Sequence, residues 1–293
     1  MKMVEVFDTI ADEIWKPGGA QVKKKRVLIA VLVIVLLLFI SDMRLKTVVY
    51  KVKSEKVSQP VKLILITDLH SCWYGKEQRT LLQAVEKEKP DIVLLGGDIF
   101  DDNGSYENAE TVIRYLSKRY ACYYVTGNHE YWSKDIDNIL DIVRSYDVMV
   151  LSGDCDRVEV NGQTINICGV DDPDVLVYVQ GAKGMEEQLK AAEEAADLED
   201  YTVLLSHRPE LVQTYEKHGF DLVLCGHAHG GQWRIPGILN GLYAPNQGLF
   251  PKYAGGRYDF DGQTMIVSRG LARESTWAPR FFNRPELVVI EVE

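Results

Sequence analysis

Five short apolar segments of this chain each end directly in polar residues of the types that bind metal ions. The segments cover residues 61–67, 92–95, 122–125, 202–205 and 222–225, and stretches with helical periodicity separate them. Alternating strands and helices are typical of α/β folds, in which sites form outside the carboxyl ends of the strands. We therefore expect the five polar segments to meet in space.

The polar residues after these segments are rich in aspartate and histidine. They are Thr-Asp-Leu-His at 67–70, Gly-Gly-Asp at 96–98, Gly-Asn-His-Glu at 127–130, Ser-His at 206–207 and Gly-His-Ala-His-Gly at 226–230. Five of the six histidines of the chain fall in these motifs, and only His218 does not. A single histidine is more often structural, but five at the ends of strands beside aspartate and glycine indicate a functional site.

The mixture of aspartate, histidine and asparagine favours borderline divalent metals over a carboxylate-only Mg²⁺ or Ca²⁺ site or a thiolate zinc site. The candidate ligands are Asp68, His70, Asp98, Asn128, His207, His227 and His229. Seven side chains are too many for one ion, and they divide between two ions if one carboxylate bridges them. Two metals about 3.5–4 Å apart stabilise the attacking and leaving oxygens of an in-line displacement, which is the geometry of phosphoryl transfer.

The order of the expected elements predicts two packed sheets with helices outside them. After the strand–helix alternation, a portion rich in glycine, proline and aromatic residues closes with strands at 265–268 and 287–292. This arrangement predicts an α/β fold, a four-layer α-β-β-α sandwich of two mixed sheets. No linker rich in serine, glycine and proline divides residues 45–293, so we expect a single domain there.

The motifs D-x-H, G-D, G-N-H-[DE], H and G-H-x-H, present in this order, resemble the signature of the calcineurin-like metallophosphoesterase superfamily. The resemblance implies one metal held by Asp68, His70, Asp98 and His229 and a second held by Asp98, Asn128, His207 and His227. Asp98 would bridge the two ions, whose identity (Mn, Fe or Zn) stays open. His129 would be catalytic and act on the leaving group, with Asp101 as the carboxylate that orients it.

The function that this resemblance implies is hydrolysis of phosphate mono- or diester or pyrophosphate bonds by a metal-activated hydroxide. Residues 230–232, 268–271 and 283–286 look like those of a membrane-anchored bacterial branch, which includes UDP-2,3-diacylglucosamine diphosphatases. A lipid pyrophosphatase of that type is therefore one alternative. A non-catalytic scaffold is another, but such proteins usually lose ligands or the catalytic histidine, and this chain retains both.

Four further residues are candidates for contact with the substrate: Arg269, Arg284, Trp73 and Trp132. The arginines could grip a phosphate, and structural ion pairs are an equal alternative. The tryptophans follow ligand motifs, so we expect an apolar rim for a lipid-linked or aromatic phosphate, with packing at the sheet edge as the alternative. The net charge of −10 argues against a general nucleic-acid binder, which needs a basic face.

The segment 27–40 is an unbroken apolar run that directly follows four cations at 23–26. We interpret residues 23–42 as an uncleaved transmembrane signal anchor, with a cleaved signal peptide as the alternative. The basic flank then predicts a cytoplasmic tail over residues 1–22. On this interpretation the protein crosses the cell membrane once and the catalytic domain, residues 45–293, is extracytoplasmic.

The Asn-Gly pair at 161–162 is the strongest two-residue hairpin signal in the chain. In the register of a type I′ turn, Val160 faces Gln163 and Cys155 faces Cys168 across a non-hydrogen-bonded pair. Such pairs bring side chains within reach of a disulfide. Two reduced thiols that face each other are the alternative.

Overall fold

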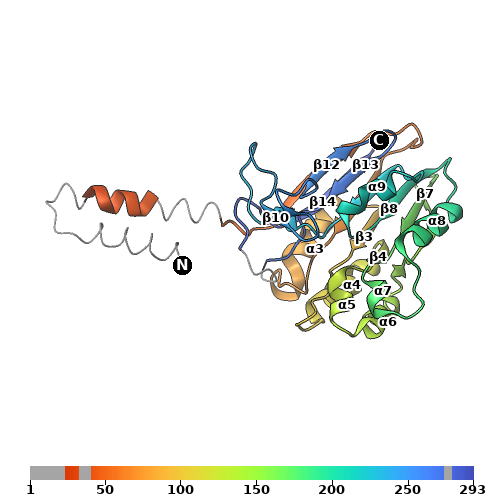
Figure 1. The fold of residues 1–293 in the computed structure, drawn as a ribbon, viewed down its shortest axis with the longest axis horizontal. Helices are drawn as coiled ribbons and strands as arrows, with labels where there is room; N and C mark the ends of the chain where they lie inside the picture. Colours follow the sequence, from red (N-terminus) through yellow and green to blue (C-terminus); the bar gives the residue numbers. More distant parts are fainter. Residues whose placement is uncertain (1–23, 33–40, 274–278) are drawn as a thin grey trace. The chain divides into compact units, whose positions relative to one another are not determined.

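The computed structural model of the chain describes residues 24–32, 41–273 and 279–293 (Figure 1). The chain divides into two units at residues 42 and 43, and each is described by itself. In the first unit, residues 24–32 form a helix. The second unit holds all the strands and the remaining helices of the described ranges.

The transmembrane signal anchor predicted over residues 23–42 is not found among the residues that the structure describes. Within the described ranges, none of the helices is both long and apolar enough to cross a membrane. The predicted membrane location with an extracytoplasmic catalytic domain is overturned by the same finding. Residues 1–23 and 33–40, which hold the predicted tail and part of the apolar run, lie outside the described residues.

Two mixed sheets form the centre of the second unit, as predicted. The first has the order β1-β14-β2-β3-β4-β5, and β2, β3, β4 and β5 are parallel. Its strands are β1 (Lys46–Val52), β14 (Glu286–Val292), β2 (Val61–Ile66), β3 (Ile92–Gly96), β4 (Ala121–Val125) and β5 (Met149–Val150). β14 runs antiparallel to β2 and brings the end of the chain next to its first described strand, β1.

The second sheet has the order β12-β13-β9-β8-β7-β6, with parallel strands in the middle and an antiparallel strand at each edge. Its strands are β12 (Gly256–Asp259), β13 (Thr264–Val267), β9 (Leu222–Cys225), β8 (Tyr201–Leu205), β7 (Gln163–Gly169) and β6 (Asp154–Val160). A separate hairpin pairs β10 (Tyr243–Ala244) with β11 (Gly248–Leu249).

The helices cover the outer faces of the sheets. The longer ones are α3 (Arg79–Glu88), α4 (Glu107–Ser117), α6 (Ile136–Ser145) and α8 (Met185–Ala195). Shorter ones are η1 (Lys76–Gln78), α5 (Asn128–Trp132), α7 (Val175–Tyr178), η2 (Pro209–Leu211), α9 (Val212–Tyr215) and η3 (His229–Gly231). Figure 1 shows α4 and α6 on one side of the second unit and α8 and α9 on the other.

Side chains that point alternately to the two faces of each sheet form three hydrophobic clusters. In β2, Leu63 and Leu65 belong to the cluster between the sheets, whereas Ile64 and Ile66 pack in the cluster that holds residues of α3, α4 and α6. A third cluster lies where the second sheet meets α8 and α9. Successive side chains of a strand point to opposite faces, so a strand that is covered on both faces is apolar throughout. The result is the predicted sequence of layers.

The register predicted for the β6–β7 hairpin is confirmed. Val160 pairs with Gln163, and Cys155 pairs with Cys168. Both cysteines are free in the structure, so the opposed thiols, and not a disulfide, are what it contains.

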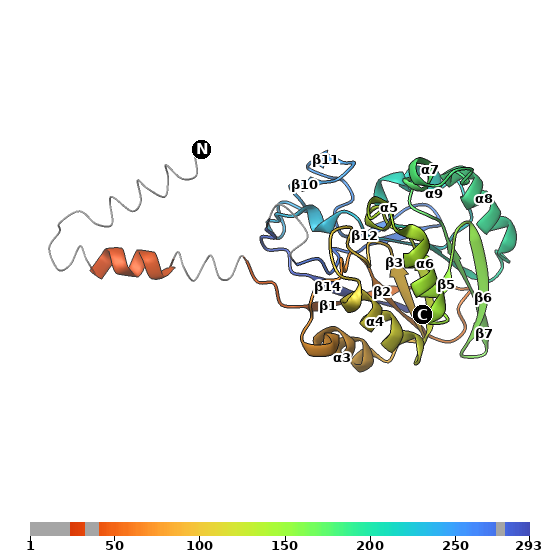
Figure 2. The same ribbon diagram turned by 90° about the horizontal axis from the view of Figure 1, so that it is seen from below.

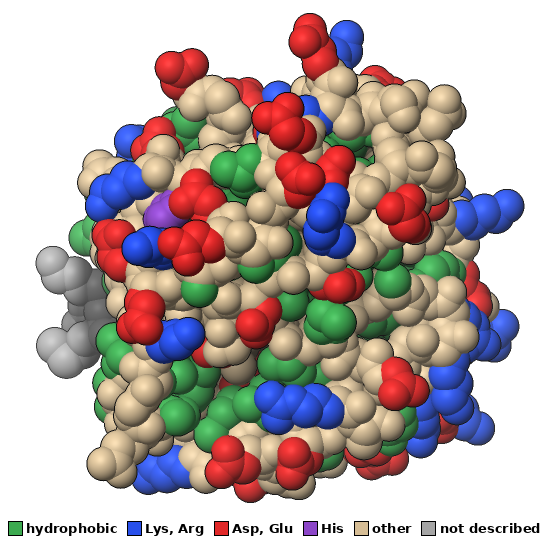
Figure 3. All heavy atoms as spheres, turned by 90° about the vertical axis from the view of Figure 1, so that its right-hand side faces the viewer, with side chains coloured by type: hydrophobic (Ala, Val, Ile, Leu, Met, Phe, Trp, Pro, Cys, Tyr) green, Lys and Arg blue, Asp and Glu red, His purple; other side chains and the backbone are tan. Residues whose placement is uncertain are grey.

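The surface of the protein carries both signs of charge. On the face that Figure 3 shows, acidic and basic side chains are interspersed, with apolar atoms between them. In the view of Figure 2, α5, α7 and the β10–β11 hairpin lie along one edge of the second unit. That edge holds the site described next.

Candidate active site

Sharp turns at the ends of the strands bring the predicted ligands together. Asp68 (φ 50°), His70 (φ 47°), Asp98 (φ 52°), His227 (φ 66°) and His229 (φ 46°) all have left-handed backbone conformations. Few non-glycine residues adopt such angles, although aspartate and histidine do so more often than most. Clusters of this kind are typical of functional sites, where the surrounding structure holds the strained backbone in place.

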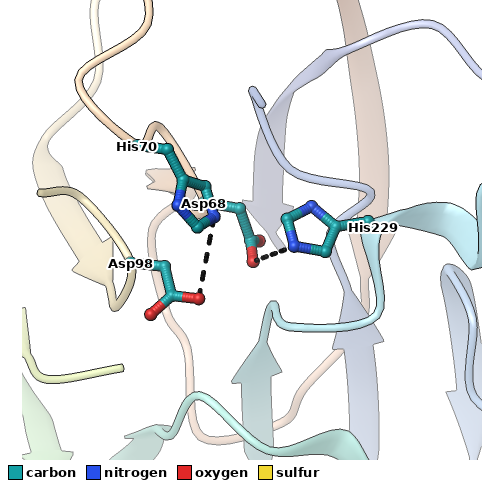
Figure 4. A group of neighbouring side chains, drawn as sticks. All are labelled: Asp68, His70, Asp98 and His229. Atoms are coloured by element: carbon teal, nitrogen blue, oxygen red, sulfur yellow. Dashed lines mark ion pairs between the residues drawn. The ribbon is translucent and has the colours of Figure 1, made fainter. Parts of the chain in front are cut away.

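A first group of four side chains meets at this edge. It consists of Asp68, His70, Asp98 and His229, which are all buried and offer ligand atoms within 4.8 Å of one another. Figure 4 shows their imidazoles and carboxylates pointing toward one another. Nε2 of His70 lies 3.7 Å from Oδ2 of Asp98, and Nε2 of His229 lies 3.8 Å from Oδ1 of Asp68.

A second group shares Asp98 with the first. It consists of Asp98, His207 and His227, again with ligand atoms within 4.8 Å of one another. Nε2 of His207 lies 3.0 Å from Oδ2 of Asp98. Asn128 is buried at the start of α5 and lines a cavity together with Asp98 and His227. The structure therefore brings all seven predicted ligands to one place and puts Asp98 where the two groups meet.

Several ligand side chains use one polar atom in a hydrogen bond with the backbone, which leaves the other polar atom available to a metal. Oδ1 of Asp68 accepts from the backbone N–H of His227, and Oδ1 of Asp98 accepts from that of His129, both at 2.9 Å. Nδ1 of His207 is 2.9 Å from the carbonyl oxygen of Gly96, so its Nε2 is the atom that faces the centre.

Within the described residues, five buried polar atoms at the centre have no hydrogen-bond partner, and two more face only each other. The five are Asp68 Oδ2, both ring nitrogens of His70, Asn128 Oδ1 and His229 Nδ1, and the two are His207 Nε2 and Asp98 Oδ2, which lie 3.0 Å apart. Each buried unpaired polar group costs about 1–3 kcal/mol, so a native protein rarely keeps several in one place without a ligand. Two divalent cations would satisfy this set of oxygen and nitrogen donors. The residues present thus fit a two-metal centre.

Burial and charge adjust the histidines for ligation. Burial lowers the pKa of His70 to about 3 and those of His227 and His229 well below the usual range, so these rings are neutral and offer lone pairs. Burial also opposes the charged form of His207, but the carboxylate of Asp98 outweighs it and raises the pKa of His207 to about 10. Binding a cation at His207 would release that proton.

Two glycines let the backbone pass close to the ligands. A Cβ at Gly97 (φ 85°) would lie 2.6 Å from Nδ1 of His207, and one at Gly127 would overlap the carboxylate of Asp98. No other residue fits at either position without moving a ligand.

Glu130 connects two of the turns that carry ligands, a role that was not predicted from the sequence. Its buried carboxylate accepts backbone N–H bonds from Asp98 (3.0 Å), Ile99 (2.8 Å), Phe100 (3.1 Å) and Gly127 (2.7 Å). It thereby joins the turn after β3 to the turn after β4. The available signal was its acidic side chain within the Gly-Asn-His-Glu motif.

His129 is paired with a different aspartate from the one predicted. Its Nδ1 lies 2.7 Å from Oδ1 of Asp102, whereas Oδ2 of Asp101 lies 3.8 Å from Nδ1 of His70. Burial works against the charged form of His129, but the charge of Asp98 and the hydrogen bond with Asp102 outweigh it and raise its pKa. The predicted pairing with Asp101 is thus replaced by one with the next residue, because the turn after β3 directs Asp101 toward His70.

The predicted substrate-binding arginines are engaged elsewhere. Nε of Arg269 donates to Oε2 of Glu286 at 2.6 Å, and Arg284 donates to the carbonyl oxygens of Arg44 (2.9 Å) and Leu45 (3.0 Å). Neither arginine is among the residues that line the cavity. Arg269 makes a structural ion pair, which is the alternative that the sequence left open, whereas Arg284 makes hydrogen bonds to backbone carbonyl oxygens.

The two predicted tryptophans differ in position. Trp132 lines the cavity of about 170 Å³ over the centre, and its ring centroid is 4.8 Å from that of His129. It is 44% exposed, and its Nε1 donates to Oδ2 of Asp174 at 2.7 Å. Trp73 is 58% exposed and does not line the cavity.

Comparison with known families agrees with this geometry. Residues 61–231, which include every predicted ligand, match the family model described as calcineurin-like phosphoesterase. The chain belongs to this family. Two divalent metals, the number that this family uses, suit the two groups of ligands.

The chain is similar to bacterial metallophosphoesterases along most of its length. It is 31% identical over 221 residues to an uncharacterized metallophosphoesterase of Helicobacter pylori, covering 74% of this chain and 55% of that protein. With an uncharacterized metallophosphoesterase of Aquifex aeolicus it shares 29% identity over 253 residues, 83% of this chain and 90% of the relative. The match therefore spans about half of the Helicobacter protein and nearly all of the Aquifex protein.

A solved structure shares the fold. The sulfate thiohydrolase SoxB of Thermus thermophilus superposes with a TM-score of 0.50 at 15% identity. The superposition covers 79% of this chain and 56% of that one. The likeness is one of fold alone.

Proposed function

We propose that this enzyme hydrolyses phosphate monoesters, phosphate diesters or pyrophosphates at the centre around Asp98. The observation that carries the proposal is the sharing of Asp98 by two groups of buried ligands beneath a cavity that His129 also lines. When bound, two divalent cations would neutralise phosphoryl oxygens and activate water for an in-line attack. Histidine-rich sites with carboxylates suit Mn, Fe or Zn, which are the ions we propose.

The side chains of the protein supply the proton for the leaving group. Asp102 holds Nδ1 of His129, so Nε2 is the ring atom left to act on substrate in the cavity. From there it can donate a proton to the departing oxygen as that oxygen becomes charged. The hydrogen bond with Asp102 fixes the tautomer and the orientation of the ring for this transfer.

The cavity also supports a substrate with an apolar or aromatic group close to the phosphate. Its volume of about 170 Å³ suits the phosphoryl end of a substrate, and the exposed rings of Trp132 and Tyr243 stand beside it. A diphosphate of the UDP-2,3-diacylglucosamine type is the second candidate substrate on this ground. Trp73 is not part of that surface, so the predicted rim is reduced to Trp132.

The experiment that tests the proposed function is an assay of the purified chain with p-nitrophenyl phosphate, bis(p-nitrophenyl) phosphate and a pyrophosphate diester. We expect no turnover after treatment with EDTA and recovery when Mn²⁺, Fe²⁺ or Zn²⁺ is added back. Metal content is measured on the same samples by mass spectrometry. An enzyme that carries two metals per chain and hydrolyses none of the three compounds would contradict the proposal.

The pairing of His129 with Asp102 leads to a prediction that separates the two neighbouring aspartates. Asp102→Ala should lower kcat about 10–100-fold, because mutation of a residue that orients a functional imidazole typically lowers activity by that factor. The loss should be larger for a phenyl than for a p-nitrophenyl leaving group, since p-nitrophenolate departs readily without a proton.

The matched control is Asp101→Ala. Asp101 faces His70, so its removal should alter metal affinity without any dependence on the leaving group. If Asp101→Ala shows the leaving-group dependence and Asp102→Ala does not, the pairing seen in the structure does not operate during catalysis.

A further inference from the structure

Asn246 stands at the mouth of the cavity on the β10–β11 hairpin. It is exposed, has a left-handed backbone (φ 57°) and lines the cavity beside the ligand residues. In the sequence it lies outside every ligand motif. Its side chain nevertheless reaches a predicted ligand: Oδ1 of Asn246 is 2.9 Å from Nε2 of His227.

A buried arginine fixes the position of that oxygen. Arg208, only 5% exposed, donates from Nε (2.5 Å) and Nη2 (2.8 Å) to the two carboxylate oxygens of Asp172, which is itself 1% exposed. This fork leaves Nη1, which lies 2.7 Å from Oδ1 of Asn246 and 3.0 Å from Nε2 of His227. Asp172 thus aims one N–H group of Arg208 at the space between the other two residues.

The donor and acceptor properties of these groups determine where the proton of His227 lies. A guanidinium has donors only, so the asparagine atom at 2.7 Å from Nη1 must be the carbonyl oxygen. The same oxygen faces Nε2 of His227, and two acceptors would repel each other at 2.9 Å. Nε2 therefore carries the hydrogen, and Nδ1 of His227 is left with its lone pair.

Arg208 by itself would favour the opposite arrangement. Its Nη1 is close enough to donate to an unprotonated Nε2 of His227. The ring would then carry its hydrogen on Nδ1, where no lone pair would remain for a cation. Asn246 removes this alternative, because its oxygen accepts from both groups at once.

We propose that Asn246 is a positioning residue that sets the tautomer of His227 and so makes its Nδ1 a ligand atom. The inference rests on the proposed function to the extent that His227 serves the second metal position. It adds a residue from outside the ligand motifs, and it makes metal binding depend on the β10–β11 hairpin.

The first test measures the tautomer without any metal. In ¹⁵N-labelled full-length protein treated with EDTA, two-bond ¹H–¹⁵N spectra distinguish an Nε2–H from an Nδ1–H ring. We expect His227 to be Nε2–H in the wild type and in Asn246→Asp, whose carboxylate oxygen still accepts from both donors. Asn246→Ala should shift the ring to Nδ1–H. An unchanged Nε2–H ring in Asn246→Ala would overturn the proposal.

The second test measures the affinity for Mn²⁺ by titration of the same proteins. Asn246→Ala should weaken the second Mn²⁺ site about 10–100-fold, as expected for loss of an outer partner of a metal-bound histidine. Asn246→Asp should retain the affinity of that site. Leu249→Ala is the matched control, because Leu249 is exposed on the same hairpin and does not line the cavity. Equal Mn²⁺ affinity in Asn246→Ala and wild type would refute the positioning role.

The outcomes distinguish this inference from the proposed function. If the wild type binds two Mn²⁺ ions and hydrolyses phosphoesters while Asn246→Ala matches it in tautomer and affinity, only the role of Asn246 fails. If the wild type binds Mn²⁺ with the expected dependence on Asn246 but hydrolyses no phosphoester, only the proposed function fails.

Discussion

Asp98→Ala is expected to reduce metal-dependent phosphoester hydrolysis to a few per cent of wild type or less. Asp98 is the one residue common to both groups of candidate ligands, and its Oδ2 lies 3.0 Å from His207 and 3.7 Å from His70. Without this anion, two cations at the centre would repel each other with no shared counter-charge. The measurement is kcat/KM at saturating Mn²⁺, with metal content determined on the same protein.

A second variant separates loss of charge from loss of structure. Asn at position 98 keeps an oxygen for the backbone N–H of His129 but removes the negative charge. We expect Asp98→Asn to show a circular dichroism spectrum and urea midpoint close to wild type and still to lose most of its activity. Substantial activity in either variant, with the metals still bound, would rule out a bridging role for Asp98.

His129→Ala is expected to lower kcat by about 10²–10⁴-fold, the range for removal of a general acid or base. His129 is absent from both groups of ligand side chains, so the variant should keep two metals per chain. The decrease in kcat should be greatest for substrates whose leaving group needs a proton, such as phenyl esters, and smaller for p-nitrophenyl esters.

The control for this prediction is Trp132→Ala, which removes the ring next to His129 but no titratable group. We expect it to change KM for aromatic esters more than the ratio of kcat between phenyl and p-nitrophenyl leaving groups. An empty metal site in His129→Ala would contradict its assignment to the leaving group, since the residue would then act through the ligands.

The fold follows from local patterns to a large extent. The strands β2, β3, β4, β8 and β9 coincide with the apolar segments, because a strand covered on both faces is apolar at every position. The β6–β7 register was also predictable, since the Asn-Gly turn fixes which residues face each other. The pairing of β14 between β1 and β2 was not predicted, as it joins residues more than two hundred positions apart.

The outer residues of the site were harder to identify than the ligands. Asp102 lies next to the predicted Asp101, and only the path of the turn after β3 decides which carboxylate reaches His129. Asn246 is separated from every motif and meets His227 only because the β10–β11 hairpin folds over the cavity. The contact of Arg269 was likewise not predictable from the sequence. Its partner Glu286 lies on β14 and comes next to Arg269 only in the folded structure.

The amino-acid sequence by itself determined which seven side chains meet at the centre, because each follows directly on a strand and the carboxyl ends of parallel strands meet at one edge. It also determined the layers, since the period of two along each strand fixes which faces are buried. The tertiary structure alone decided which atoms of those side chains are free. That choice depends on hydrogen bonds to residues such as Glu130, Asp102 and Asn246, whose partners lie in other turns of the chain. A hydrogen bond requires a particular distance and direction between two groups, and no local pattern in the sequence encodes either of them.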